Sequence, residues 1–446
     1  FVGDSVGRSH TTGNFNIMSG YYAGNSQTTA GCNVKIGYNA GRKGNGSDNV
    51  MLGATAGCEI ISDCNVVIGA YAAKCMCNGA YNIAIGSNAL CGSTTVSDNT
   101  GCTNISIGSY SGNKITSGSY NLFFGNFAGG NVSTGGCNVY LGRGAGGAAG
   151  SGGTGNSNIA IGCYAGGHVA SGAYNIMYGR GAGKCYNGSH NIAMGQEALC
   201  GSSTVGNNIG NCNIALGKYA GKVITTGYCN VILGTCAGKV LTTGYDNVLI
   251  GAEAGGALTG GGNAFFNVMI GAGAGKGTVD GYGNVILGRC AGELGDFGNY
   301  NFFGGYGSGK NTTGAYNTFF GACSGDNVTS GSNNVAIGYQ AEVASATGSN
   351  QLAIGINANR WITGDSSWNI TVNDIAATNF NSTSDIRLKT NIKRIEDPLA
   401  KVIQIEGVTF DWKEYNKPAL GVIADQVEEV IPELVQGTDP KTVNYN

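Results

Sequence analysis

Apolar and small residues recur in one short pattern along most of the chain. Each unit reads asparagine, apolar, variable, apolar, glycine, and then two variable residues before Ala-Gly or Ser-Gly, as in "NISIGSYSG" from Asn104 and "NVILGTCAG" from Asn230. Apolar residues at every second position predict a β-strand of about five residues, and the glycines predict turns. The anchors run from Asn16 to Asn334, with Gln351 as a substituted last one, which gives about twenty units.

The spacing of the anchors contains a longer repeat as well. Most steps are 16 or 17 residues, but the steps from Asn82 are 22, 17, 17, 20, 17 and 16, and those from Asn191 are 22, 17, 17, 20, 17 and 17. A block of six units has therefore been duplicated. The longest steps predict loops over Leu90–Thr103 and Leu199–Cys212 that protrude from the stack, because stacked units tolerate insertions only on a free face.

A strand and turns repeated at this period predict an all-β body, a parallel β-roll or β-helix solenoid of about twenty coils. The anchor asparagines are expected to stack in a ladder and to bond to the backbone of the turns. The first proline is Pro398. The absence of proline before residue 398 fits a solenoid, since the backbone N–H groups of each coil form hydrogen bonds with the next coil.

The strand residues predict self-association. We expect the first and third residues after each asparagine to face the interior of the coil, and the residue between them to point outward. That middle residue is also mostly apolar, as at Val67, Phe123 and Ile232. An apolar stripe along a whole rod is too long for a soluble monomer, so the pattern predicts association about the long axis.

Composition narrows the function classes. Charged residues make up 11% of the chain and the net charge is −2, which gives no reason to expect a nucleic-acid partner. No apolar run is long enough to cross a membrane, so membrane insertion is not expected. Sixteen cysteines, none in a CxxC pair, are interpreted as packing residues or as interlayer or interchain disulfides. We expect no metal site and no cofactor. The chain opens in mid-repeat at Phe1, so a fragment or a processed form is expected.

The repeat resembles known fibrous surface proteins. The stretch "NNVAIGYQAEVASATGSNQLAIGINA" at Asn333–Ala358 is similar to the head repeats of trimeric autotransporter adhesins, and the Thr-Thr-Gly turns resemble bacteriophage tail-fibre repeats. The resemblance implies three chains to a rod, a left-handed roll and a role in attachment to a host surface.

The repeat pattern and the density of charged residues both change near residue 384. Before it, residues 356–383 lose the repeat and bring in Trp361 and Trp368, which we interpret either as a cap on the last coil or as a connector. After it, charges are dense. Gly407–Lys413 alternates like a strand, and the following stretch predicts an amphipathic helix with one apolar side. That side comprises Val422, Ile423, Val427, Val430, Ile431 and Leu434.

The C-terminal stretch resembles the intramolecular chaperone domain of phage endosialidases and tail spikes (peptidase S74). Three motifs carry the resemblance: S-D-x-R-x-K from Ser384, the strand at Gly407–Lys413, and "GVIADQVEEVIPE" from Gly421. The resemblance implies trimerisation and then self-cleavage at Ser384–Asp385, with Ser384 as nucleophile and Lys389 as base. Such a lysine must lose its proton through burial or nearby cations.

These observations predict a homotrimeric viral (phage) tail-fibre or spike shaft on the virion tail. It would attach to a host cell-surface glycan or protein receptor, contact other virion tail proteins and carry a self-cleaving chaperone. The regions would be a shaft at 1–355, a cap or connector at 356–383 and a chaperone domain at 384–446. A bacterial trimeric surface adhesin and a polysaccharide-degrading tail spike are the alternatives. Because glycosidases need paired carboxylates and the body has only scattered acidic residues, no enzyme acting on a substrate is expected.

Overall fold

The computed structural model describes residues 1–147, 152–202, 205–259, 261, 263–357, 359–372, 390–411, 418–437 and 441–443. Contacts divide the chain into two units, Phe1–Asp374 and Ile375–Asn446. Each unit is described by itself below.

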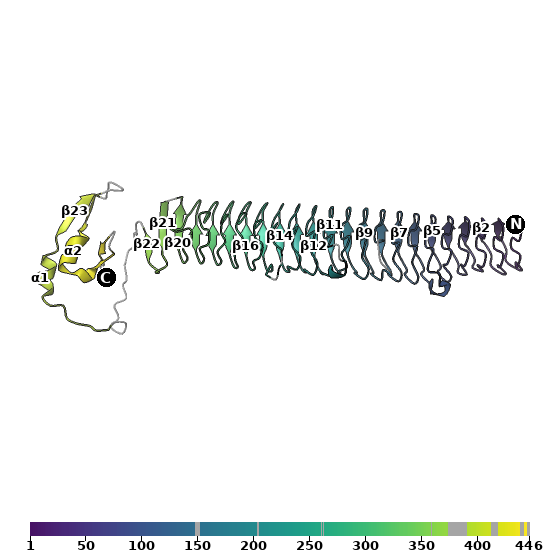
Figure 1. Ribbon diagram of the computed structural model, residues 1–446, viewed down its shortest axis with the longest axis horizontal. Coiled ribbons are helices and arrows are strands. Elements are labelled where there is room, and N and C mark those ends of the chain that lie inside the picture. Colours follow the sequence, from purple (N-terminus) through teal and green to yellow (C-terminus); the bar gives the residue numbers. More distant parts are fainter. Residues whose placement is uncertain are drawn as a thin grey trace. The chain divides into compact units, whose positions relative to one another are not determined.

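The first unit is a parallel β-solenoid with one short strand per coil (Figure 1). Neighbouring strands pair in parallel at equivalent positions, so that Val231, Ile232 and Leu233 lie beside Val248, Leu249 and Ile250. The predicted solenoid of about twenty coils is confirmed, although most strands have three residues rather than about five. Within the described residues the strands are β1 (Ile17–Ser19), β2 (Val34–Ile36), β3 (Val50–Leu52), β4 (Val66–Ile68), β5 (Ile83–Ile85), β6 (Ile105–Ile107), β7 (Leu122–Phe124), β8 (Val139–Leu141), β9 (Ile159–Ile161), β10 (Ile176–Tyr178), β11 (Ile192–Met194), β12 (Ile214–Leu216), β13 (Val231–Leu233), β14 (Val248–Ile250), β15 (Val268–Ile270), β16 (Val285–Leu287), β17 (Phe302–Gly304), β18 (Thr318–Phe320), β19 (Val335–Ile337) and β20 (Leu352–Ile356).

The anchor asparagines form the predicted ladder inside the solenoid. Asn230 is buried, and both its backbone N–H and its side-chain Nδ2 donate to Oδ1 of Asn213, at 3.1 and 2.9 Å. The same Nδ2 donates to the carbonyl of Gly244 at 2.8 Å. Asn247 repeats this arrangement on Asn230. Each hydrogen bond contributes about 1 kcal/mol net, and a lost partner inside the coil costs more.

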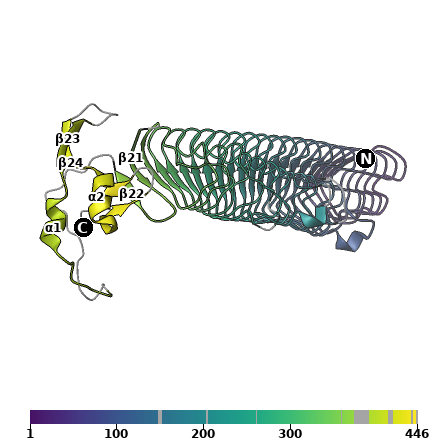
Figure 2. The same ribbon diagram turned by 60° about the vertical axis from the view of Figure 1, so that its left-hand side comes forward.

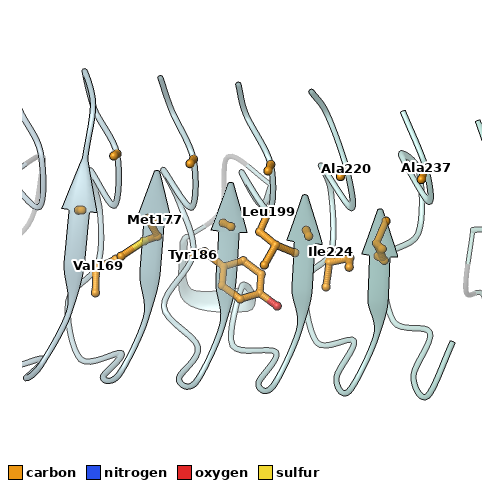
Figure 3. Packing of buried hydrophobic residues seen from close by; sticks show 14 of the residues in the cluster. Val169, Met177, Tyr186, Leu199, Ala220, Ile224 and Ala237 are labelled. Atoms are coloured by element: carbon orange, nitrogen blue, oxygen red, sulfur yellow. The ribbon is translucent and has the colours of Figure 1, made fainter. Parts of the chain in front are cut away.

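The predicted facing of the strands was wrong. The middle strand residue points into the coil and is at most 3% exposed in every coil, as for Ile232, whereas its neighbours Val231 and Leu233 point outward. The reason is the ladder. An asparagine that stacks inside the coil brings the residue two positions later to the same face, because side chains alternate along a strand. Figure 3 shows how middle residues such as Met177 pack with Tyr186, Leu199 and Ile224 from the turns.

The glycine after each strand is required by the stacking. Gly217 has φ of +132°, and a Cβ there would come within 2.6 Å of the carbonyl oxygen of Gly234 in the next coil. A side chain is therefore excluded both by the backbone conformation and by the neighbouring coil. The repeat glycines stack directly on one another and set the corner of the coil.

The sixteen cysteines are free in the structure. The two positions at which cysteine recurs, before the asparagine and two after the glycine, are left-handed turn positions, with φ from +53° at Cys229 to +62° at Cys64. Burial raises the pKa of Cys91 and of Cys200 to about 11, which keeps both thiols protonated and unreactive at neutral pH. Cys58 is buried, whereas Cys32, Cys137, Cys212 and Cys229 are exposed, so the packing and the disulfide interpretations both stay predictions.

Two antiparallel strands continue the sheet after the last coil. Strand β21 (Asn359–Gly364) pairs with β20, with an irregularity at Ile354/Gly355, and β22 (Ile370–Val372) pairs with β21. The edge of β20 is thereby covered by main-chain pairing. The two tryptophans of the segment do not cover the coil end by burying their rings, since Trp361 is 56% and Trp368 is 85% exposed.

The second unit is a small α+β arrangement. Strands β23 (Gly407–Asp411) and β24 (Pro418–Val422) form an antiparallel hairpin. Helix α1 (Pro398–Ile403) precedes it. After it come α2 (Ala424–Val430), the 3-10 turn η4 (Pro432–Leu434) and the strands β25 (Val435–Gln436) and β26 (Thr442–Val443). The predicted strand is confirmed. The predicted helix is shorter than its apolar pattern, because Val422 ends β24 and Leu434 lies in η4.

Candidate functional site

The predicted cleavage residues, Ser384 and Lys389, lie outside the described residues, as do Asp385 and Arg387. The chain is described again from residue 390, where Lys393 and Arg394 are exposed. The roles of Ser384 and Lys389 therefore stay predictions.

An ion-pair cluster joins the parts of the second unit. Nζ of Lys441, next to β26, lies 2.6 Å from Oδ1 of Asp425 and 2.7 Å from Oε2 of Glu428, both on α2. The hydrogen bond from Lys441 holds the pKa of the Asp425 carboxyl below its ordinary value, and the two carboxylates raise the pKa of Lys441. The cluster ties the residues after β25 back to α2.

The described part of this unit keeps little of its apolar surface from solvent. Val427 of α2 is buried at 1% exposure, but Leu420 of β24 is 82% exposed, and Leu399 and Ile403 of α1 are 69% and 72% exposed. These three side chains are available for contact with another chain.

The outer side of the solenoid carries a continuous apolar face, which we call the outer strand face. It consists of the first and third residue of β1–β20, and these are apolar or aromatic in every coil except at Ser19, Gly304 and Thr318. Exposure reaches 59% at Ile17, 55% at Phe124 and 58% at Phe320. The face continues from coil to coil, because neighbouring strands pair at equivalent positions.

The two long insertions fold as the repeat spacing predicts. Each holds one 3-10 turn, η1 (Val96–Asp98) in the first and η2 (Val205–Asn207) in the second. Figure 2 shows both as short helical turns on the same side of the coils, blue for η1 and teal for η2. At the base of the first loop, buried Asn99 donates to the carbonyls of Cys75 and Ser93, each at 2.8 Å. Asn208 donates at 2.8 Å to Cys185 and Ser202 in the second loop.

A cluster of cations and an aromatic ring lies in the turns that follow the repeat glycine, and it was not predicted from the sequence. Its members include Arg143, Tyr164, Arg180 and Lys184, which lie on β8–β10 coils and line one pocket. They are widely spaced in the chain. Aligning the units on their asparagines would have found them, because Arg143 and Arg180 both follow their anchor by five residues.

The described residues contain neither a helix that could span a membrane nor a cluster of side chains that could hold a metal ion. None of their helices is long and apolar enough to cross a membrane. The same residues contain no group of three or more His, Cys, Asp or Glu side chains arranged to hold a metal ion.

Comparison with known proteins gives two kinds of match. The family described as chaperone of endosialidase matches residues 384–436. Long tail fiber protein Gp37 of Enterobacteria phage K3 and that of Enterobacteria phage T2 are each 38% identical over 76 residues, which is 16% of this chain and 6% of the relative. The chain thus matches a small fraction of the length of these relatives. No solved structure matches the chain.

These matches confirm the predicted resemblance to phage fibres and the predicted location on the virion tail. They favour a phage protein over a bacterial adhesin, since both named relatives are phage fibre proteins. The chain accordingly carries a segment at residues 384–436 that matches the chaperone-of-endosialidase family, and over 76 residues it is similar to the long tail fibre proteins of two phages.

Proposed function

We propose that the chain forms a homotrimeric shaft that attaches the phage to a host surface, and that its chaperone domain assists trimer assembly and then cleaves itself off. The observation that carries the trimer is the outer strand face, which continues over all of β1–β20. Association about the long axis would bury this face in every coil at once. A host cell-surface glycan or protein is the proposed receptor, and other virion tail proteins are the proposed neighbours.

The energy available along the shaft is large. Burying two partly exposed aliphatic side chains, such as Val231 and Leu233, is worth at most about 1–2 kcal/mol per coil. Repeated over the coils, this gain exceeds the cost of bringing chains together, which is estimated at about 4–15 kcal/mol. Association along the whole shaft is therefore favourable.

The same repetition creates a need for an assembly aid. Equivalent coils present nearly equivalent apolar pairs, so three chains could align one coil out of step at little cost. A domain that first joins the chains at one end would fix their relative alignment. The exposed Leu399, Ile403 and Leu420 support such a role, since they offer an apolar surface for contact with another copy.

The trimer is tested by charge on the outer strand face. In the double variant Leu233→Lys and Ile250→Lys, six lysines would be buried together at the axis of a trimer, so we expect monomers or disordered assemblies by light scattering coupled to size-exclusion chromatography. Circular dichroism of the coils should be retained, because both residues point away from the interior.

The matched control places the same charges elsewhere on the coils. The double variant Thr235→Lys and Thr226→Lys changes exposed turn residues, and it should still give the mass of a trimer. A wild-type chain that runs as a monomer, or a Leu233→Lys and Ile250→Lys variant that remains a trimer, would refute the proposed axis of association.

A further inference from the structure

A pocket of about 410 Å³ lies beyond the glycine corner, on a different side of the coil from the outer strand face. It is lined by residues five, six and nine positions after the anchor asparagine. Those that matter here are Arg143, Tyr164, Arg180, Gly181, Lys184 and Glu197. Its volume falls in the range of small-ligand sites, which is about 300–1,000 Å³.

The pocket exists because a large ring stands between two glycines. Tyr164 occupies a position that holds Gly144 in the coil before it and Gly181 in the coil after it. Nη2 of Arg143 donates to the Tyr164 hydroxyl at 2.7 Å, and the Arg143 guanidinium lies 5.3 Å from the ring centroid. Nζ of Lys184 lies 5.8 Å from the same centroid. These contacts hold the ring in place. Because Gly181 has no side chain, the space beside the ring in the next coil is not filled by a side chain at this position.

The pocket has a surplus of positive charge. Arg143, Arg180 and Lys184 bring three cations, and Glu197 is the one carboxylate among its lining residues. Its Oε2 lies 2.9 Å from Nζ of Lys222, which holds the pKa of Glu197 below its ordinary value, and its Oε1 lies 4.0 Å from Nη2 of Arg180. One carboxylate is therefore shared between two cations. The local charge of the pocket is thus positive, whereas the net charge of the whole chain is −2.

The cations continue along the shaft at a regular spacing. Arg143, Arg180 and Lys218 occupy the same position in the coils of β8, β10 and β12, that is, in every second coil. At about 4.8 Å per layer, they are roughly 10 Å apart. A second ring, Tyr219, continues the row, with Nζ of Lys222 4.6 Å and Nζ of Lys218 5.0 Å from its centroid.

The duplicated block shows that this cluster is not a by-product of the repeat. The positions of Arg143, Tyr164 and Lys184 correspond in the second copy to Ala252, Gly273 and Glu293; only Arg180 is kept, as Arg289. The two acidic residues of that region, Glu253 and Glu293, pair with Lys276 and Lys310. The second copy thus keeps one of the three pocket cations and has a glycine where the pocket has its ring.

We propose that this row of cations and rings binds an acidic polysaccharide, with an anionic sugar in the pocket and its apolar face against Tyr164. The inference rests on the proposed host attachment and names the receptor class. Cations roughly 10 Å apart fit a glycan that carries its anionic group on alternate sugars. They fit a nucleic acid poorly, since it carries a phosphate on every nucleotide, one per about 3.4 Å of duplex axis on each strand.

The test measures binding of defined oligomers to the full chain by isothermal titration calorimetry at physiological ionic strength. The probes are a hyaluronan octasaccharide, with a carboxylate on every second sugar, and a phosphorylated lipopolysaccharide core oligosaccharide. Maltooctaose and a single-stranded DNA oligonucleotide are the neutral and nucleic-acid controls. We expect an acidic glycan to bind and maltooctaose not to bind. Binding of the hyaluronan probe alone identifies a carboxylate as the ligand group, and binding of the core oligosaccharide alone identifies a phosphate.

Variants locate the site. The double variant Arg180→Ala and Lys184→Ala should raise the Kd of the acidic glycan about tenfold or more, since charged hydrogen bonds are each worth about such a factor. Arg289→Ala, the matched change in the second copy, should leave the Kd unchanged.

The inference is overturned if neither acidic glycan binds, if maltooctaose or the oligonucleotide binds as tightly, or if the double variant binds like the wild type. The mass of each preparation is determined first. A trimer that binds no acidic glycan refutes this inference alone, and a monomer that binds one refutes the trimer alone.

Discussion

Lys35 is the residue that departs most from the repeat. It occupies the inward strand position between Met18 and Met51 of the adjacent coils and has no exposed surface. Its Nζ donates to the carbonyls of Gly44 at 3.1 Å and Gly41 at 3.4 Å. Burial nevertheless lowers the pKa of Lys35 from 10.5 to about 8. Two carbonyl partners thus replace only part of the hydration that the ammonium group loses.

We predict that Lys35→Met stabilises the shaft in a pH-dependent way. Between pH 8 and 10.5 the unfolded chain binds more protons at this residue than the folded chain, so wild-type stability rises with pH there. Below pH 8 both states are protonated and the full penalty is present. The gain of the variant should therefore be largest below pH 8, at about 3 kcal/mol, and shrink toward pH 10.5. Thermal unfolding followed by circular dichroism measures it.

The control is Lys114→Met, which removes an exposed lysine on another coil. Its effect on the midpoint of unfolding should be small and should not change across the same pH interval. A Lys35→Met gain of equal size at both ends of the interval would show that the buried charge is not its origin.

At the scale of elements, each protruding loop is held by one buried asparagine. Asn208 bonds to the backbone of Cys185 below the loop and of Ser202 within it, while the adjacent Asn207 is exposed. We predict that Asn208→Ala releases the loop, because it removes the two hydrogen bonds that Nδ2 of Asn208 donates to the backbone. Limited proteolysis should then cut within Leu199–Cys212 faster than in the wild type, while the coils on either side remain resistant.

Asn207→Ala provides the comparison, since it changes the same side chain one residue earlier without removing a bond to the coil below. It should be cut at the wild-type rate. Equal acceleration by both variants would mean that Asn208 does not anchor the loop.

The elements also show which features of the fold can be predicted from the sequence. The anchor spacing predicts the strands, their parallel order and both loops, because each depends on contacts between equivalent positions such as Asn213 and Asn230. It did not predict which strand face is buried. That face could have been inferred, because Asn230 and Ile232 lie two positions apart and therefore point to the same side of the strand. The site at Tyr164 and Lys184 depends on contacts across three coils, which a unit read by itself does not contain. The roles of Ser384 and Lys389 rest on motif resemblance.

At the scale of the whole molecule, assembly and cleavage are proposed to be coupled. We predict that Ser384→Ala and Lys389→Ala each give an uncut chain that still forms a trimer, since these residues are proposed as nucleophile and base and not as contacts. Mass spectrometry of the expressed full-length protein, with light scattering on the same sample, measures both properties. If Lys389→Ala is cut at the normal rate, the proposed base is wrong.

A third variant separates assembly from chemistry. Leu420→Asp together with Ile403→Asp places charge on the exposed apolar surface of the second unit without touching the buried Val427. It should block trimer formation and cleavage together. Cleavage of this variant as a monomer would show that the two events are independent.

The duplicated block has a consequence for the evolution of such fibres. The strand of each coil pairs with the strands of the coils before and after it, and equivalent residues of the two copies make equivalent bonds, as Asn82 and Asn191 do with Asn104 and Asn213. Recombination between the copies of the gene segment can therefore remove or add six coils and leave every junction of a kind that already exists. The reach of the fibre then changes in steps of roughly 29 Å, six layers at about 4.8 Å each. The length of the shaft can thus change while the way in which each coil folds stays the same.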